Sequence, residues 1–224
     1  MSSDAALVMP DPNRVRRYDP QRDLAPISRL VATPSVLVVG GDAAPRNFAE
    51  WLAWLCRQPA GRVSYASAGI GTSSHRAGEL LAKMTGVEMT QVPSNQSPLP
   101  DVVAGRVGFV FANVATAMPL IRAGRLRALA VSSLQRTPIA SELPTLAESG
   151  LPGFAAVAWF AMLAPVATPR EMLARWQRAA RTALATAAVK TKLQSLGIEA
   201  VGNSPEELRE TVERESGKWA GVIR

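Results

Sequence analysis

A run of small and polar residues follows a short apolar segment between Tyr65 and Leu80, in the stretch YASAGIGTSSHRAGEL. Its two nearby glycines let the backbone approach a ligand closely, and hydroxyl side chains follow them directly before a helical pattern. The N–H groups at the start of a helix, together with the helix dipole, favour an anion. The residues that this chemistry singles out are Gly69, Gly71, Thr72, Ser73 and Ser74.

Two further polar loops follow predicted strands in the same part of the chain. The loop PSNQS comes after Val92 and holds Asn95 and Ser97, and the loop NVAT comes after Ala112 and begins with Asn113. In parallel sheets, ligands gather outside the carboxyl ends of the strands. The three loops therefore predict one shared site, although ordinary strand-to-helix turns favour the same residue types, and the pattern alone leaves both interpretations open.

The glycine-containing stretch lacks the motifs of three enzyme classes. Gly71 is not followed by the lysine of a P-loop, Ser74 stands where a dinucleotide fingerprint has its third glycine, and no G-x-S-x-G elbow is present. The only histidine, His75, could act with Ser73 or Ser74 in a small hydrolase. A helix start beside Ser74 is an awkward place for a general base, so we expect a binding protein and not an enzyme, with the hydrolase as the alternative.

Composition narrows the class of protein further. With 224 residues, of which 47% are hydrophobic, the chain can form one large domain or two small ones. The single cysteine, Cys56, excludes an internal disulfide and a zinc site with paired thiolates, and we expect no metal and no cofactor. The net charge of +7 raises the odds of an anionic partner. The basic residues are scattered without a nucleic-acid motif, so we expect a solvated basic surface and no nucleic-acid binding.

Alternating strands and short helices between Ser35 and Val131 indicate an α/β layer with a mostly parallel sheet. The predicted strands are Val36–Val39, Val63–Ala66, Glu88–Val92, Gly108–Ala112 and Arg127–Val131. The predicted helices between them are Arg46–Arg57, His75–Met84, Pro98–Ala104 and Ala115–Ala123.

The rest of the chain has a different organisation. Gln135–Gly153 is rich in Pro, Ser and Thr, which predicts a long surface connection. Ala156–Pro165 predicts a buried strand, and its Trp159 either belongs to the core or lines a cleft between lobes. The sequences TPRE and SPEE predict capped helix starts at Thr168 and Ser204.

These patterns predict two lobes. One lobe comprises residues 34–128, and the other combines residues 1–33 with residues 129–224. The chain then crosses between the lobes twice.

Longer stretches of the sequence resemble the substrate-binding proteins of tripartite tricarboxylate transporters, also called Bug receptors. The resemblance covers nearly the whole chain in the same order, and its motifs are quite specific when they are taken together. The similar stretches are YDPQRDLAPISRLVATPSVLVV, YASAGIGTSSHRAGELL, AGRVGFVFANVATAMPLIRAGRLRALAVSS, ELPTLAESGLPGF, AWFAMLAPVATP and GNSPEEL.

The resemblance implies a two-lobed α/β receptor with a type II periplasmic-binding-protein-like architecture. Such a receptor closes on a small organic acid in the periplasm and presents it to a membrane permease, and we expect it to be a monomer. The resemblance further implies that the stretches GIGTSSH, SNQS and ANV face the ligand, with Gly71, Thr72 and Ser73 as its main contacts and His75 beside them. Ser2 and Ser3 match a stretch of the first lobe that also lies near the ligand.

The chain departs from the family's pattern at three places. Ser94 and Asn95 stand where the family usually has an aromatic and a basic residue. Ala112 stands where an aspartate is common, which argues against an amino-acid ligand held by that acid. A signal peptide, the first strands and a Pro/Gly-rich loop are missing before Met1, so we expect a truncated chain with an incomplete first lobe that binds weakly alone. Without a leader the chain would stay in the cytoplasm, which leaves a cytoplasmic sensor or interaction module that reuses the fold as a further alternative.

Overall fold

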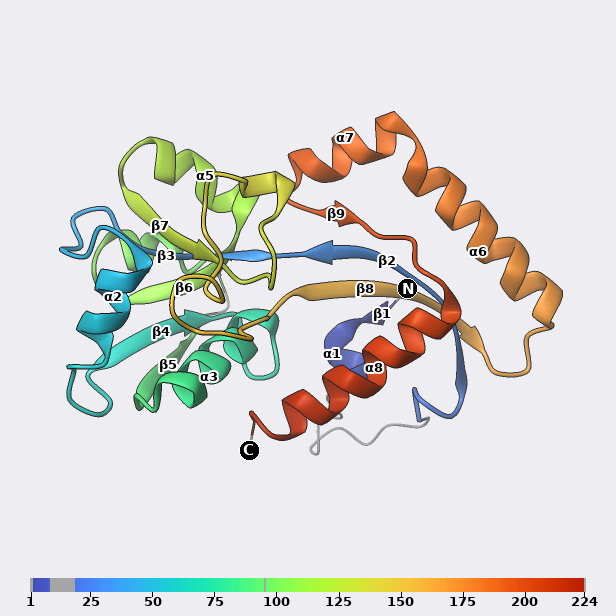
Figure 1. Ribbon diagram of the computed structural model, residues 1–224, viewed down its shortest axis with the longest axis horizontal. Coiled ribbons are helices and arrows are strands. Elements are labelled where there is room, and N and C mark those ends of the chain that lie inside the picture. Colours follow the sequence, from blue (N-terminus) through green and yellow to red (C-terminus); the bar gives the residue numbers. More distant parts are fainter. Residues whose placement is uncertain (1, 9–18, 95, 224) are drawn as a thin grey trace. The chain divides into compact units, whose positions relative to one another are not determined.

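The computed structural model describes residues 2–8, 19–94 and 96–223. The chain forms two compact units: a terminal unit, Met1–Thr33 with Ala158–Arg224, and a central unit, Pro34–Val157. Each unit has its own sheet and its own helices (Figure 1). In the part of the chain that the structure describes, no helix is long and apolar enough to cross a membrane.

The central unit is built on a five-stranded sheet in the order β5-β4-β6-β3-β7. Strand β4 runs parallel to β5 and β6, whereas β3 pairs antiparallel with β6 and β7. Strands β4, β5, β6 and β7 therefore run in one direction, as the predicted mostly parallel sheet requires, and β3 runs against them. The sequence did not indicate the reversal of β3, because a near-continuous apolar run marks a strand that is buried on both faces and does not give its direction. The strands are β3 (Ser35–Gly40), β4 (Val63–Ser67), β5 (Met89–Pro93), β6 (Phe109–Asn113) and β7 (Leu126–Val131).

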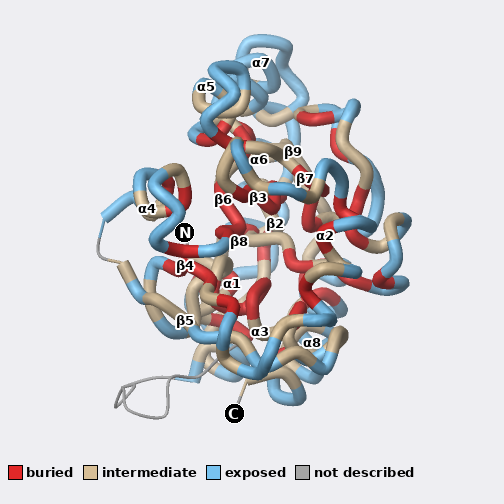
Figure 2. Tube along the Cα trace, turned by 90° about the vertical axis from the view of Figure 1, so that its left-hand side faces the viewer, coloured by how far each residue is buried: buried red, intermediate tan, exposed pale blue. Residues whose placement is uncertain are grey.

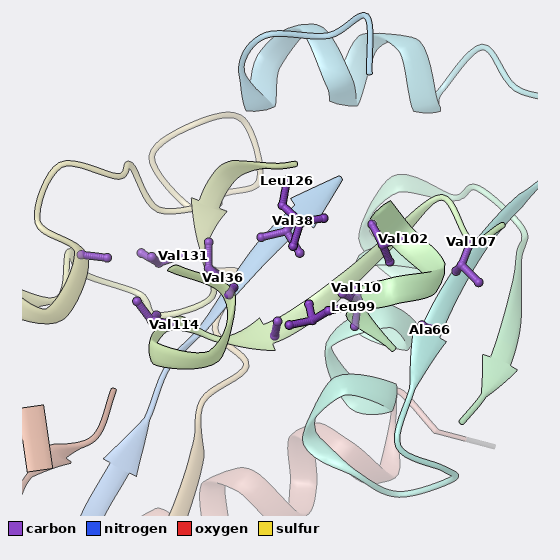
Figure 3. Packing of buried hydrophobic residues seen from close by; sticks show 13 residues of the cluster. Val36, Val38, Ala66, Leu99, Val102, Val107, Val110, Val114, Leu126 and Val131 are labelled. Atoms are coloured by element: carbon purple, nitrogen blue, oxygen red, sulfur yellow. The ribbon is translucent and has the colours of Figure 1, made fainter. Parts of the chain in front are cut away.

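The two faces of this sheet carry different side chains, because successive residues of a strand point to opposite faces. On one face, the ring of Phe109 lies 5.7 Å from the ring of Tyr65 and 5.1 Å from that of Trp51, which belongs to helix α2 (Phe48–Leu55). On the other face, Val110 belongs to an aliphatic cluster with residues of α4 (Leu99–Val103) and α5 (Val114–Arg122) (Figure 3). Helices cover both faces, so β3, β4 and β6 are largely buried (Figure 2).

Helix α3 (Ser73–Thr85) lies close to β4 and ends at Gly86, which has a φ of +71°. Gly78 faces the fully buried ring of Tyr65, and a Cβ atom at Gly78 would lie 2.2 Å from the Cε2 atom of that ring. The helix can approach the strand this closely only with a glycine at this position, because a methyl group would overlap the ring.

The segment after β7 is not the surface connection that its composition predicts. Only a short 3₁₀ helix, Pro138–Ala140, interrupts it, yet several of its apolar side chains are buried. The N–H of Leu146 donates to the carbonyl of Val131 at 3.1 Å, and the ring of Phe154 stacks on Phe111 with 5.9 Å between centroids. Prolines and hydroxyl residues shape the turns of this segment while its apolar residues fill the core.

The boundary of the central unit therefore lies at Val157 and not at the predicted Ala128. The N–H of Ala156 still donates to the carbonyl of Ser132, at 2.8 Å. The prediction ended the unit at its last strand, whereas the following residues fold back onto that strand.

The terminal unit has an antiparallel sheet in the order β1-β8-β2-β9. Its two long central strands are β2 (Leu24–Thr33) and β8 (Ala158–Pro165), with β1 (Ser2–Ser3) and β9 (Glu199–Ala200) at the edges. Helix α8 packs against β2 and against α1, and none of the described residues of α6 or α7 is buried. The helices are α1 (Asp4–Val8), α6 (Arg170–Ala185), α7 (Ala187–Ser195) and α8 (Pro205–Ala220).

One of the two predicted helix caps of the terminal unit is present. Ser204 accepts from the N–H of Glu207 at 3.2 Å, and the Glu207 carboxylate accepts from the N–H of Ser204 at 2.8 Å, which completes a capping box. The predicted Thr168 cap is wrong. Pro169 takes the cap position without a side-chain hydrogen bond, and the N–H of Thr168 instead closes a turn with Pro165 at 2.9 Å.

Replacing Gly78 by alanine should lower the free energy of unfolding by about 1–3 kcal/mol, because the new methyl group overlaps the Tyr65 ring. Urea denaturation followed by circular dichroism measures the change. Gly217 in α8 is the matched control, since a Cβ atom there meets no atom within 4 Å. Alanine at Gly217 should stabilise by about 0.5–1 kcal/mol, and equal effects at both positions would contradict the close approach of α3 to β4.

Replacing Ser204 by alanine should destabilise the protein by about 1 kcal/mol, because it removes the acceptor for an N–H in the first turn of α8. The same replacement at Thr168 should change stability by less than about 0.5 kcal/mol, because that side chain does not cap α6. Differential scanning calorimetry of both variants measures the difference. An equal loss would mean that Thr168 caps its helix in solution.

Candidate functional site

Strands β5, β4 and β6 end at the same edge of the central sheet, because β4 runs parallel to both of its neighbours. The register places Ser67 opposite Pro93 on one side and Ala66 opposite Val110 on the other. We call this the loop edge: it carries residues 68–72, the loop after β5 and the turn at Asn113. The three polar loops of the sequence thus leave one edge of the sheet, while their contact with a ligand stays a prediction.

Ser67, at the end of β4, joins the first polar loop to the second. Its hydroxyl accepts from the Gln91 side-chain amide at 2.7 Å and from the N–H of Gly69 at 3.2 Å. Its carbonyl accepts from the N–H of Ser94 at 2.8 Å. Sequence reasoning missed both Ser67 and Gln91; the available signal was a serine placed between an apolar strand and a glycine loop.

The glycine loop has a conformation that other residues rarely adopt. Gly69 has a φ of +111° and Gly71 a φ of +79°, in the left-handed region that favours glycine. The hydroxyl of Thr72 donates to the carbonyl of Gly69 at 2.6 Å and closes the loop. Ile70, between the two glycines, is 81% exposed, so this loop presents an apolar side chain to solvent.

The helices that begin at the loop edge differ in how their first turns are satisfied. Asn113 caps α5: its Oδ1 accepts from the N–H of Ala115 at 2.8 Å and of Thr116 at 3.3 Å. Thr72 is the N-cap of α3 but makes no side-chain hydrogen bond to it. Within the described chain, the start of α3 therefore offers backbone donors to an outside acceptor, whereas the start of α5 is closed by its own cap.

His75 is buried in the first turn of α3 and bonds to the backbone of the glycine loop. Its Nδ1 accepts from the N–H of Gly71 at 3.3 Å, and its Nε2 lies 3.9 Å from Oε1 of Glu79. The same Glu79 oxygen accepts from the Tyr65 hydroxyl at 2.5 Å. Burial lowers the pKa of His75, Glu79 partly opposes this, and the charge of Arg76 adds to it. Burial and the contact with Glu79 raise the pKa of Tyr65.

The arrangement does not support the hydrolase alternative. Nδ1 of His75 bonds to Gly71, and among the described residues it makes no bond to a serine hydroxyl. The hydroxyl of Ser74 accepts from the N–H of Ala68 at 3.2 Å and lies 3.3 Å from the Thr72 hydroxyl. A nucleophile needs a base within hydrogen-bond reach, and the described residues place none beside Ser73 or Ser74.

The other predicted ligand residues lie at different places. Asn95 falls outside the described residues, and Ser97 is exposed in the loop after β5. Ser2 and Ser3 form β1 of the terminal unit and pair with β8, in which Trp159 is buried. The indole N–H of Trp159 has no hydrogen-bond partner among the described residues. The role of these residues toward a ligand stays a prediction.

A further hydroxyl at the loop edge escaped the sequence analysis. Ser132 follows β7 and accepts from the N–H of Ser35 at 2.9 Å, which places the end of β7 beside the start of β3. The hydroxyl oxygen of the next residue, Ser133, is buried and has no partner within the described chain. A serine pair after an apolar strand was the only signal for it.

A cavity of about 390 Å³ lies elsewhere in the central unit, between α5 and the start of β7. Arg127 lines it, but its guanidinium donates to the carbonyls of Gly41, Ala43 and Pro45. The positive guanidinium that could pair with an acid in this cavity is therefore already hydrogen-bonded to backbone carbonyls. The loop edge is the better candidate because its donors include a helix start without a side-chain cap.

The sequence profile described as "Tripartite tricarboxylate transporter family receptor" matches residues 1–224. The chain belongs to this family. Its members are receptors for solutes and not enzymes, which agrees with the bonding of His75. Among curated relatives, the UPF0065 protein from the tcbD-tcbE intergenic region of Pseudomonas sp. (strain P51) is 40% identical over 92% of this chain. The protein BugT of Bordetella pertussis is 31% identical over the same share. The chain spans 62% and 64% of their lengths.

Solved structures of the family have the same fold. Rpa4515 of R. palustris, solved with adipate, is 31% identical with a TM-score of 0.82; the match covers 99% of this chain and 75% of that one. The periplasmic binding protein BugD is 28% identical with a TM-score of 0.79 over the same shares. MatC of Rhodopseudomonas palustris, with bound malate, is 27% identical with a TM-score of 0.77, covering 99% and 76%. The α/β architecture is therefore that of the periplasmic binding proteins of this receptor family.

Replacing Asn113 by alanine should destabilise the protein by about 1 kcal/mol, because α5 loses the acceptor for two N–H groups. Replacement by aspartate should preserve stability, since its carboxylate accepts the same bonds. Thermal denaturation of the two variants compares them. If both variants lost the same stability, the fold would depend on the side-chain N–H₂ group of Asn113 and not on the oxygen that caps α5.

Proposed function

We propose that this chain binds a small organic carboxylate at the loop edge and serves as the receptor of a tripartite tricarboxylate-type transporter. The observation that carries the proposal is the start of α3, where Thr72 leaves the first turn without a side-chain cap beside two glycines of positive φ. A carboxylate oxygen is the acceptor that such a turn favours.

The chemistry of the loop edge suits an anion and not a cation. The described residues of the three loops include backbone N–H groups and hydroxyls but no acidic side chain. An ammonium group would find no charge partner there, whereas a carboxylate would accept several charge-assisted hydrogen bonds, each worth about 1.5–3 kcal/mol. Ala112, just before the third loop, is consistent with a ligand that lacks an amino group.

The comparisons support the same class of ligand. Rpa4515 was solved with adipate and MatC with malate, which are both small dicarboxylates. The family description supports a transporter partner, and the name of BugD as a periplasmic binding protein supports the periplasm as the place of action. We extend ligand class, partner and location to this chain as proposals, because it spans less than two thirds of its curated relatives.

Titration of the ¹⁵N-labelled chain with adipate and with malate tests the proposal, because NMR also detects weak binding. We expect chemical-shift changes to concentrate at residues 69–75. Replacing Gly69 by alanine should weaken binding at least about tenfold, since a side chain at a φ of +111° forces the loop to rearrange.

Gly86 provides the matched control for this variant. It also has a positive φ, of +71°, and at both positions a Cβ atom would meet no atom within 4 Å, but it lies at the opposite end of α3. Alanine at Gly86 should cost stability and leave the affinity unchanged. Shift changes away from the loop edge, or no response to either acid at saturating concentration, would refute the proposed site.

A further inference from the structure

We propose that His75 is a positioning residue: in its neutral form it holds the glycine loop through the N–H of Gly71, without contacting the ligand. The consequence for ligand affinity rests on the proposed function. The coupling between His75 and the loop rests on the geometry of the central unit alone.

The direction of the hydrogen bond carries the inference. Gly71 donates its N–H to Nδ1 of His75, so Nδ1 must lack a proton. The side chain is only 8% exposed, and its Nε2 faces the carboxylate of Glu79. One nitrogen of the ring thus bonds to the glycine loop, and the other faces Glu79, which accepts from Tyr65 of β4. The ring therefore connects the loop to the contact between α3 and β4.

Protonation of His75 breaks this connection. An imidazolium carries a proton on both nitrogens and cannot accept from Gly71, so the two N–H groups would face each other. The loop would then have to give up the conformation in which Gly71 has a φ of +79°. The state of one ring proton is therefore coupled to the loop that begins the candidate site.

The surroundings of His75 favour the neutral ring. On α3, Arg76 and burial lower the pKa of His75 while Glu79 raises it, with burial the largest effect. On β4, the titratable neighbour is Tyr65, whose raised pKa keeps its hydroxyl protonated. The neighbouring strands Met89–Pro93 and Phe109–Asn113 contain no titratable side chain. The positive end of the α3 dipole acts in the same direction as burial.

The sign of the pH dependence separates positioning from direct contact. If His75 positions the loop, affinity for an acid falls as the pH drops through the folded-state pKa of His75, which burial lowers from the ordinary value of a histidine. If His75 instead touched the ligand, the imidazolium would attract the carboxylate, and affinity would rise over the same range.

The first test needs no ligand. His75 is the only histidine of the 224 residues, so its ring signals are assigned without ambiguity. We expect the Gly71 amide signal to titrate with the same midpoint as the His75 ring, and its hydrogen exchange to accelerate below that midpoint. In His75→Asn the side-chain oxygen still accepts from Gly71 but does not titrate, so the Gly71 signal should stay constant. A Gly71 signal that ignores the ring titration would overturn the proposal.

The second test measures adipate affinity between pH 5.5 and 8. His75→Ala should weaken binding roughly tenfold at pH 8, the weight of about one backbone hydrogen bond. His75→Asn should recover most of the lost affinity. Because asparagine does not titrate, the pH dependence that remains in this variant is that of the ligand's own carboxylates, and it serves as the baseline. Wild-type affinity that rises relative to this baseline at low pH would overturn the positioning role. If the wild-type chain binds no carboxylate at pH 8, the proposed function fails, and the Gly71 titration still decides the coupling.

Discussion

Strand β4 runs parallel to both of its neighbours, and this direction organises the rest of the central unit. Because helices cover both faces of the sheet, the interiors of the strands are apolar and their polar groups collect at the ends. Parallel neighbours bring three such ends to one edge. The direction of the strands therefore brings together the hydroxyls, amides and helix starts of that edge. The sequence of any one loop does not explain this.

Capping then distinguishes the helix starts at the loop edge. Asn113 accepts from the first turn of α5, whereas the Thr72 hydroxyl turns back to Gly69 and leaves the first turn of α3 without a side-chain acceptor. A family of receptors for small acids needs donors of this kind and no catalytic base. The bond from Gly71 to His75 is consistent with that need, because Nδ1 of the imidazole accepts from the backbone and not from a serine hydroxyl.

Much of the fold was predictable from local patterns. Every predicted strand and helix of the central unit overlaps an observed one, and Ser204 caps α8 as its capping box predicts. Two of the failures have a common cause. The folding of the segment after β7 and the direction of β3 depend on contacts with distant residues, such as Leu146 with Val131, and local composition carries no information about them. Thr168 fails for a local reason, because its N–H closes a turn with Pro165 and the helix begins one residue later than predicted.

The sequence by itself determined which residues belong to the polar loops, that the glycines there serve a backbone conformation, and which family the chain resembles. These follow from residue type and spacing, which act over a few residues. Only the tertiary structure decided that Ser67 joins two of the loops, that Asn113 is committed to α5 while α3 is not closed by a cap, and that His75 accepts from Gly71. The physical reason is that a hydrogen-bonding group has several local partners of similar energy, and packing against the sheet selects among them.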